Sequence, residues 1–295
     1  MSNTSSKMKI KVIAVVGATA SGKTKYSIEL AKKINGEIVS ADSRLVYKGF
    51  DIGTAKPTTD EMEGIPHHMI DIVEPEVDYS AGLYKTRATE VICDIASRGK
   101  VPIVAGGTGL YIDILLKNFD LPEIEPDVSL RNELSAYSSA ELYSILLSKD
   151  PEGALTIEPN DKKKIIRAIE IINSTGKSLS LSRGVSESPF EVEWIGCNYP
   201  RDVLYERINK RVDKMLEDGL IDEVRALLEK HGRIYNLINT IGYKEIIQYL
   251  DGAMSLDDSV ELLKQNTRKY AKRQLTWFRK NDKIKWSVFP DKLKR

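Results

Sequence analysis

Hydrophobic positions along the first hundred residues follow two different periods. Short runs rich in β-branched residues predict buried strands at Val12–Val16, Glu37–Ser40 and Val101–Ala105. Apolar residues at helical spacing predict helices at Lys23–Ile34 and Ser80–Ser97. Strands that alternate with helices are typical of an α/β fold built on a parallel sheet. This part of the chain therefore predicts an α/β sheet domain.

The pattern changes near residue 119, where an acidic, proline-bearing linker begins. Asp120–Pro126 has neither period, and a strand-like segment returns only at Phe190–Gly196. We therefore predict a helical insertion at 120–190, within a parallel-sheet core formed by 1–119 and 191–295. The further predicted helices are Val128–Tyr137, Ser139–Lys149, Asp161–Ser174, Arg201–Asp218, Ile221–His231, Gly242–Leu250 and Leu256–Arg279.

Composition narrows the class of protein. The chain has 295 residues, of which 41% are hydrophobic and 29% charged, as in ordinary soluble globular proteins. No apolar run approaches the roughly 20 residues that span a bilayer, and Met1–Lys9 lacks the apolar stretch of a signal peptide. The two cysteines, Cys93 and Cys197, form no disulfide framework. We expect no membrane association and a cytoplasmic location.

Charge is concentrated at the C-terminal end. Residues 261–295 hold twelve Lys or Arg and three acids, a net charge of +9, so the rest of this +1 chain carries −8. Lys264, Arg268 and Lys272 are spaced four apart, and aromatic residues lie between and after them. Basic residues mixed with aromatics favour a nucleic-acid partner. A solvated basic helix whose aromatic residues face the core gives the same pattern.

One motif predicts a phosphate site. It fits G-x-x-x-x-G-K-[ST] and lies between the first predicted strand and the first predicted helix, where a P-loop works. Backbone N–H groups and the helix N-terminus bind phosphate oxygens there, the lysine reaches the terminal phosphates, and the hydroxyl binds Mg²⁺. A chance glycine-rich turn is the alternative. The motif residues are Gly17, Ala18, Thr19, Ala20, Ser21, Gly22, Lys23 and Thr24.

Two further strand ends bear on the chemistry. Asp42 follows the second strand and is expected beside the P-loop, as a base or metal ligand, or simply as a turn residue. The strand ending at Ala105 continues into Gly106, Gly107 and Thr108. A P-loop ATPase usually carries an acidic residue there. Its absence argues against ordinary ATP hydrolysis, although Asp42 can supply the missing carboxylate.

Three other groups of residues are ambiguous. His67 and His68 are adjacent but have no further metal-ligand spacing, which favours a structural role in a loop. Asn160 and Asp161 precede a basic segment and are typical of a helix N-cap. Arg207 and Arg211 lie one helical turn apart and could direct guanidinium groups at one anion, or simply face solvent.

Taken in order along the chain, these motifs resemble those of the bacterial tRNA dimethylallyltransferases (tRNA isopentenyltransferases). The resemblance extends from about residue 10 to 287. Only the P-loop is shared widely, whereas Asp42–Gly49 together with Asp51–Pro57 is highly specific to that family. The stretches that carry it are Gly17–Thr24, Ser40–Gly49, Asp51–Pro57, Pro66–His67, Gly106–Thr108, Asn160–Glu170, Ile241–Glu245 and Lys272–Arg279.

The resemblance implies transfer of a dimethylallyl group from dimethylallyl diphosphate to the exocyclic N6 amine of an adenosine beside the anticodon in tRNA. By match to the family, Asp42 is the general base and Thr108 binds near the amine and the diphosphate. Lys23, Thr24 and Arg211 then stabilise the leaving diphosphate together with Mg²⁺, which Thr24 binds. Charge builds on that group in the transition state, where fixed donors and a metal act best.

The resemblance also implies a binding path for the tRNA anticodon stem-loop, whose target base must leave its stack. Residues near Gly242–Lys244 are expected along this path, and we expect a monomer. Besides the catalytic Asp42 and Thr108, the implied tRNA-binding residues are Ser43, Arg44, Leu45, Arg131, Lys163, Lys164 and Arg167.

Three other functions compete with this interpretation. An enzyme that prenylates free adenine nucleotides would need neither the insertion nor the basic tail. A P-loop kinase of small metabolites is disfavoured by the missing acidic residue. A non-catalytic RNA-binding protein would have no reason to keep Lys23, Thr24, Asp42 and Thr108 together.

Overall fold

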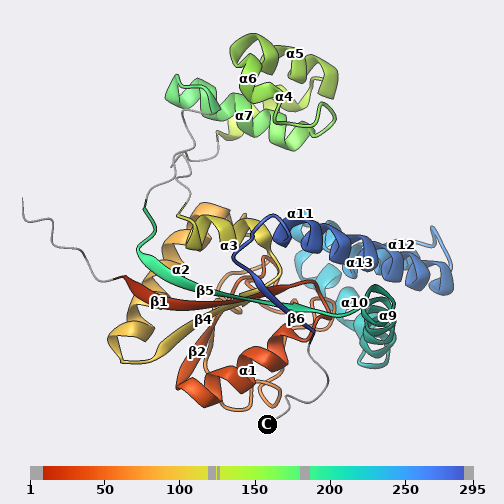
Figure 1. The fold of residues 1–295 in the computed structure, drawn as a ribbon. Coiled ribbons are helices and arrows are strands. Elements are labelled where there is room, and N and C mark those ends of the chain that lie inside the picture. Colours follow the sequence, from red (N-terminus) through yellow and green to blue (C-terminus); the bar gives the residue numbers. More distant parts are fainter. Residues whose placement is uncertain (1–8, 119–123, 125–126, 180–186, 289–295) are drawn as a thin grey trace, which may run out of the picture. The chain divides into compact units, whose positions relative to one another are not determined.

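A computed structural model describes residues 9–118, 124, 127–179 and 187–288 of the chain. Its centre is a six-stranded parallel sheet with the order β3-β2-β4-β1-β5-β6, which confirms the predicted α/β class (Figure 1). The strands are β1 (Ile10–Gly17), β2 (Gly36–Ser40), β3 (His67–His68), β4 (Val101–Gly106), β5 (Phe190–Asn198) and β6 (Lys285–Val288).

Helices cover both faces of this sheet and continue beyond its carboxyl edge. On one face α1 packs Ile28 and Ala31 against Val15 of β1 and Ile38 of β2. The other face is covered by α2 and α3 (Figure 1). Burial on both faces explains why β1 is a nearly continuous apolar run. The helices of this unit are α1 (Lys23–Ile34), α2 (Ala81–Ser97), α3 (Gly109–Leu116), α9 (Arg201–Glu217), α10 (Leu220–His231), α11 (Tyr235–Ile238), α12 (Tyr243–Leu250) and α13 (Leu256–Phe278).

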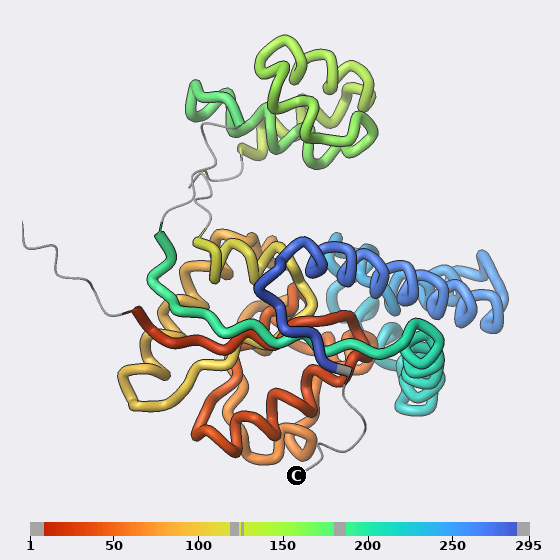
Figure 2. The backbone as a smooth tube through the Cα atoms, viewed as in Figure 1, coloured from red at the N-terminus to blue at the C-terminus, as the bar shows by residue number. Residues whose placement is uncertain are grey.

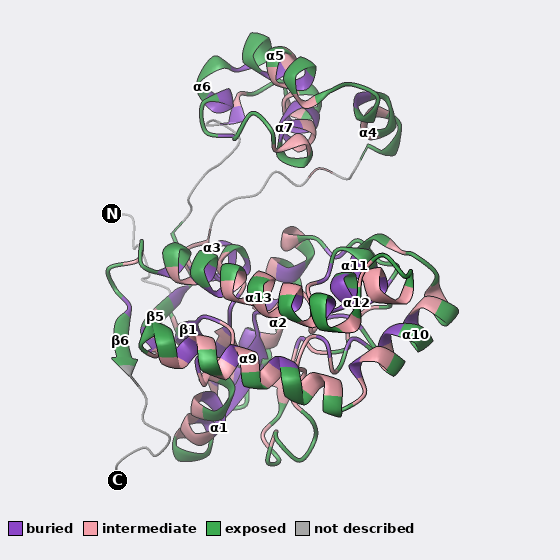
Figure 3. Cartoon of the chain, turned by 90° about the vertical axis from the view of Figure 1, so that its right-hand side faces the viewer, coloured by how far each residue is buried: buried purple, intermediate pink, exposed green. Residues whose placement is uncertain are grey.

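The chain returns to the sheet at its end. Figure 2 shows the C-terminal segment passing along β5, where β6 pairs in parallel from Ile195↔Lys285 to Asn198↔Val288. The outer helices α9 and α10 have buried residues on one side and exposed residues on the other (Figure 3). None of the helices in the described ranges combines the length and apolarity that crossing a membrane requires.

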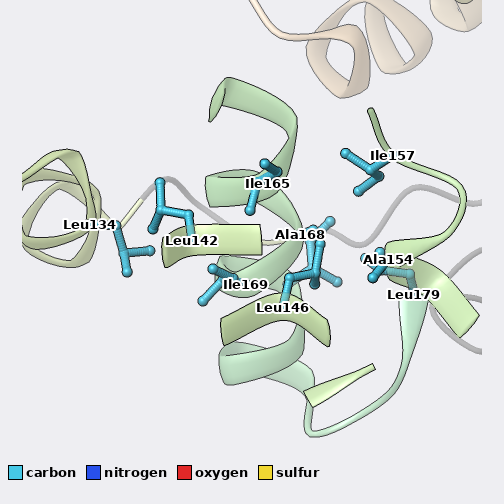
Figure 4. Packing of buried hydrophobic residues seen from close by; sticks show 10 residues of the cluster. Leu134, Leu142, Leu146, Ala154, Ile157, Ile165, Ala168, Ile169 and Leu179 are labelled. Carbon is cyan, nitrogen blue, oxygen red and sulfur yellow. The ribbon is translucent and has the colours of Figure 1, made fainter. Parts of the chain in front are cut away.

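The chain divides into two compact units, 1–116 with 189–295, and 117–188. The second unit occupies nearly the range predicted for the insertion. Its helices are α4 (Val128–Ser135), α5 (Ser139–Lys149), α6 (Pro151–Ala154) and α7 (Lys162–Thr175). Leu142 and Leu146 of α5 pack with Ile165 and Ile169 of α7 in a core of its own (Figure 4). As expected of an N-cap, the Asp161 carboxylate accepts from the Lys164 N–H, at 3.1 Å.

Candidate active site

The P-loop lies where the sequence predicts it, between β1 and α1. Gly17 passes so close to β5 that a Cβ atom there would lie 2.3 Å from the Cys197 carbonyl oxygen. Gly22 adopts a left-handed conformation with φ of 84°, which glycine tolerates best and which turns the chain into α1. The loop therefore has the local geometry that directs backbone N–H groups toward an anion.

The lysine of this loop is held inside it. Lys23 Nζ donates to the Ala18 carbonyl at 2.6 Å. Lys23 retains some exposed surface as a residue, yet its ammonium group lies among protein atoms, and this burial lowers its pKa from 10.5 to about 8. A cation that has lost water and gained a neutral oxygen is a favourable partner for a phosphate group.

Two arginines of α9 contact the P-loop in different ways. Arg211 Nη1 donates to the Thr19 hydroxyl at 2.9 Å and Nη2 to the Ala55 carbonyl at 3.4 Å, and burial lowers the pKa of its guanidinium. Arg207 Nε donates to the Ala20 carbonyl at 3.0 Å, and its guanidinium lies 4.6 Å from the centre of the Tyr199 ring. Arg211 lines the cavity beside the loop, whereas Arg207 supports the loop from outside that lining.

A glutamine connects the P-loop to the end of β4. Gln274 Oε1 accepts from the Thr19 N–H at 2.8 Å, and Nε2 donates to the Gly107 carbonyl at 2.9 Å. The side chain is buried, so the bond to Gly107 is shielded from water and the bond from Thr19 is partly shielded. The motif Lys272–Arg279 contains this residue, but nothing in its local pattern identifies a partner 255 positions away.

Asp42 lies at the carboxyl end of β2, in the cavity that also contains Lys23. Ala41 N–H donates to the Ala105 carbonyl at 2.8 Å, which extends the β2–β4 pairing to the residue before it. Asp42 Oδ1 accepts from the Arg44 N–H at 2.8 Å. That single bond fixes the turn and leaves the carboxylate in the cavity wall, beside Ser43, Arg44 and Leu45.

Thr108 does not line the cavity but contacts residues that do. Its Oγ1 accepts from the Ser43 N–H at 3.0 Å, and its own N–H donates to the Ala41 carbonyl at 3.1 Å. It also bonds the hydroxyl of Tyr270, whose pKa burial raises to about 12. Ser43 and Tyr270 line the cavity, while Thr108 does not. In this arrangement Thr108 orients two cavity residues.

The cavity itself has a volume of about 370 Å³ and brings several sequence motifs together. Besides polar side chains of the P-loop and of the β2 end, it is lined by apolar residues of α9 and by Leu263 of α13. Among the lining residues that carry charge or hydrogen-bonding groups are Thr19, Lys23, Thr24, Asp42, Arg44, Arg211, Arg273 and Gln274. A small anionic ligand with an apolar part is the chemistry that such a lining suits.

The Asp51–Pro57 loop forms another wall and is held by a partly buried network. Glu223 accepts from the N–H groups of Ile52 and Gly53 at 2.7 and 2.9 Å, and from the Tyr243 hydroxyl at 2.7 Å. A Cβ atom on Gly53 would lie 2.2 Å from the Tyr243 ring, so glycine is required there. Lys56 Nζ contacts Asp51 Oδ1 at 2.6 Å and also pairs with Asp71.

This network assigns structural roles to part of the Gly242–Lys244 segment, which we expected along the tRNA path. Gly242 and Tyr243 are buried, and Lys244 is exposed. The Gly242 N–H donates to the Glu245 carboxylate at 2.8 Å. From the preceding turn, Thr240 and Ile241 line the cavity.

Both adjacent histidines form contacts within the fold, and His67 also lines the cavity. His67 Nδ1 lies 2.8 Å from the Ile65 carbonyl oxygen, and His68 Nε2 lies 2.8 Å from Glu37 Oε2. Glu37 also accepts from Arg98 and Lys100, and these bonds, that of Arg98 first, hold the pKa of its carboxyl far below the usual value. Within the described ranges, no three His, Cys, Asp or Glu side chains gather to hold a metal ion.

Comparison with known proteins agrees with this geometry. The IPP transferase family model matches residues 45–281, and the isopentenyl transferase model matches residues 10–77.

The chain belongs to the IPP transferase family.

A tRNA dimethylallyltransferase from Halalkalibacterium halodurans is 46% identical, over 96% of this chain and 93% of its own. The crystal structure of a full-length tRNA isopentenylpyrophosphate transferase from Bacillus halodurans is 45% identical, with a TM-score of 0.73 over 95% of this chain and 90% of that one. A eukaryotic dimethylallyltransferase acting on tRNA is 32% identical, with a TM-score of 0.79 over 91% and 70%. The resemblance inferred from the motifs is confirmed.

In this IPP transferase, the basic residues predicted to contact tRNA from the insertion lie within the 117–188 unit. Glu170 of α7 is fully buried and accepts from Arg131 Nε and Nη2 at 2.9 and 3.0 Å. It also pairs with Arg167. Burial alone would raise the pKa of the Glu170 carboxyl, but the bonds from both arginines outweigh it and the pKa is lowered. The two arginine side chains remain about one third exposed.

The two lysines of this set are exposed at the start of α7. Lys164 pairs with the N-cap carboxylate of Asp161 at 2.6 Å, and Lys163 precedes it. Arg167 follows one turn further along α7, and Arg131 contacts the same helix at Glu170.

The basic face predicted for α13 is used largely within the fold. Lys264 pairs with Asp213 of α9 at 2.6 Å, and Arg268 donates to Asn209 at 2.8 Å. Of the aromatic residues, Phe278 is buried and Trp277 Nε1 donates to Asp113 at 3.0 Å. Periodicity identified this face correctly. It could not show that Asp213 and Asn209 of α9 bind the basic side chains on it.

Proposed function

We propose that this protein transfers a dimethylallyl group from dimethylallyl diphosphate to the exocyclic N6 amine of the adenosine beside the anticodon in tRNA. The observation that carries the proposal is the composition of one cavity. It combines a P-loop, two desolvated cations and a carboxylate, and its apolar side chains suit a short hydrocarbon group.

The reaction follows from these groups. The amine nitrogen forms a bond to the terminal allylic carbon while the bond between that carbon and the diphosphate oxygen breaks. Lys23, Arg211 and the P-loop N–H groups neutralise the charge that develops on the departing diphosphate. The Asp42 carboxylate accepts the proton that the amine loses. The products are the prenylated adenosine and diphosphate.

Mg²⁺ fits the donor set of this cavity. The Thr24 hydroxyl and the Asp42 carboxylate both line it, and oxygen donors together with phosphate oxygens are the ligands that Mg²⁺ prefers. We propose that Thr24 holds the ion. When bound, Mg²⁺ supplies further neutralisation of the leaving group.

We propose that Ser43, Arg44 and Leu45 contact the entering nucleotide, because they line the cavity beside Asp42. Thr108 acts through Ser43 and Tyr270. Arg131, Lys163, Lys164 and Arg167 are proposed to bind tRNA phosphates, since partly exposed guanidinium and ammonium groups suit a solvated polyanion. We also propose that the protein acts in the cytoplasm as a monomer, which sedimentation would test.

Labelled dimethylallyl diphosphate, incubated with the protein and either unfractionated tRNA or AMP, tests the proposal. We expect label in tRNA, at an adenosine beside the anticodon. Label in AMP but not in tRNA would contradict it, and ATP turnover without RNA would favour a kinase.

A further inference from the structure

A side chain from α13 closes one end of the P-loop. The amide of Gln274 accepts from the Thr19 N–H at 2.8 Å and donates to the Gly107 carbonyl at 2.9 Å. Gln274 is only 5% exposed, so the amide is both satisfied and sheltered. Exchange of such a buried bond for water is unfavourable, and the contact holds the loop in one conformation.

The room for this amide comes from a glycine. A Cβ atom on Gly107 would lie 2.2 Å from Gln274 Nε2, so a side chain at 107 would displace the amide. In P-loop ATPases the region after the corresponding strand holds an acidic residue that binds Mg²⁺ beside the nucleotide phosphates. Here the same region holds Gly106, Gly107 and a neutral amide from a distant helix.

The contacts of Lys23 show which end of the P-loop is closed. A P-loop lysine reaches the outermost phosphates of a nucleotide. Lys23 Nζ donates to the Ala18 carbonyl at 2.6 Å, which places the ammonium group at the Ala18–Thr19 end. At this end Arg211 donates to the Thr19 hydroxyl at 2.9 Å. The Thr19 N–H lies at this same end and is bonded to Gln274, so it is not available to a further phosphate.

The amide also presents the wrong charge to an additional phosphate. Gln274 Oε1 is an acceptor with partial negative charge and would lie beside phosphate oxygens that are acceptors too. A third phosphate at this position would find the Thr19 N–H already bonded and would meet the Gln274 Oε1 acceptor instead of a donor. A diphosphate can use Lys23, Arg211 and the other N–H groups of the loop without needing the Thr19 N–H.

We propose that Gln274 is a specificity-determining residue that limits the P-loop to diphosphates and excludes triphosphates. The inference rests on the proposed function for the identity of the prenyl ester, and on the Thr19–Gln274–Gly107 geometry for the number of phosphates. It gives the glutamine of the Lys272–Arg279 motif a role in choosing the phosphate ligand.

Calorimetric titration of the full chain with inorganic diphosphate and inorganic triphosphate, each with Mg²⁺, tests this role. The wild-type protein should bind diphosphate at least about tenfold more tightly than triphosphate, the effect of one hydrogen bond to a charged oxygen. Gln274→Ala should reduce that ratio by about tenfold, mainly through tighter triphosphate binding. Gln265→Ala, an exposed glutamine on the same helix, should leave the ratio unchanged.

Gln274→Met decides the outcome if the alanine variant does not fold, because it fills a similar volume and frees the Thr19 N–H. An unchanged ratio in a folded Gln274 variant, or equal wild-type affinity for the two ligands, overturns the inference. A preserved effect on the ratio without label transfer to tRNA would contradict the proposed function and support the role of Gln274. Label transfer to tRNA with an unchanged ratio would support the proposed function and contradict the role of Gln274.

Discussion

Two groups of cations in this protein are held in opposite ways. In the sheet unit, Lys23 and Arg211 donate to neutral oxygens of Ala18, Thr19 and Ala55, and burial lowers the pKa of both. In the insertion unit, Arg131 and Arg167 pair with the buried carboxylate of Glu170 and stay about one third exposed.

The difference indicates two kinds of anion. A desolvated cation whose hydrogen bonds go to neutral oxygens gains much from a small anion that enters its cavity and loses its own water. An arginine whose charge is already balanced and partly hydrated gains less per contact, which suits the phosphates of a polymer that is bound at many points. We therefore propose that the sheet unit determines the rate of the chemical step and that the insertion contributes most of the phosphate contacts that set tRNA affinity.

Removal of the base should have the largest effect. Asp42→Ala should lower the rate of prenyl transfer by about 10²- to 10⁴-fold, the usual contribution of a general base, while tRNA affinity stays close to wild type. Single-turnover transfer and filter binding measure the two quantities. Asp60→Ala removes an exposed aspartate of the same unit and should change neither. Lost tRNA binding by Asp42→Ala would make Asp42 a tRNA contact.

Replacement of Arg211, the arginine proposed to bind the leaving diphosphate, should have the second largest effect. Arg211→Lys keeps the charge but loses the planar fork that reaches Thr19 and Ala55, so kcat should fall by about 100-fold with little change in KM for tRNA. Arg225→Lys alters an exposed arginine that pairs with Asp222 at 3.1 Å and should behave as wild type. A wild-type kcat for Arg211→Lys would remove this arginine from the leaving-group site.

The lowered pKa of Lys23 predicts a pH dependence of diphosphate binding. The free protein releases the ammonium proton near pH 8, whereas bound diphosphate favours the charged form, so binding takes up a proton above that pH. Affinity should therefore be greatest below pH 8 and fall by about tenfold between pH 7 and pH 9. Calorimetry across this range measures it.

Lys23→Met serves as the control for that titration. It has no ammonium group, so it should bind diphosphate weakly and without the decline above pH 8. The same decline in both proteins would show that another group titrates.

Substitutions in the insertion should have the smallest effect on the chemical step. Lys163→Ala should weaken tRNA binding a few-fold at moderate salt and lower the slope of log affinity against log salt by about one phosphate contact. Lys149→Ala, an exposed lysine of the same unit that bonds Asn173 at 3.0 Å, should keep the wild-type slope. A changed kcat of Lys163→Ala at saturating tRNA would contradict the claim that the insertion affects tRNA affinity and not the chemical step.

The sequence predicts the regular core of this fold well because periodicity reports burial. It located β1, β2, β4 and β5 and most helices, since each has a clear apolar period. It missed β3, which is only His67–His68, and β6, whose Lys285–Val288 carries no strand period. It also missed α3, Gly109–Leu116, where apolar residues nearly fill the helix and leave no polar face to define a period.

The candidate site was predictable to the extent that it depends on local motifs. The P-loop and the strand end at Asp42 each have a sequence signature, and parallel strands bring their carboxyl ends together. Glu223 and Gln274 hold the cavity through partners 171 and 255 positions away, and no local pattern encodes such contacts. The position of Thr108 behind Ser43 likewise depends on tertiary packing.

Steady-state kinetics of Arg211→Lys and Arg167→Ala, measured side by side with tRNA as the varied substrate, test the central claim most directly. The account predicts that Arg211→Lys lowers kcat and leaves KM for tRNA unchanged, while Arg167→Ala raises KM and leaves kcat unchanged. Equal losses of kcat in both variants, or the opposite assignment, would contradict it.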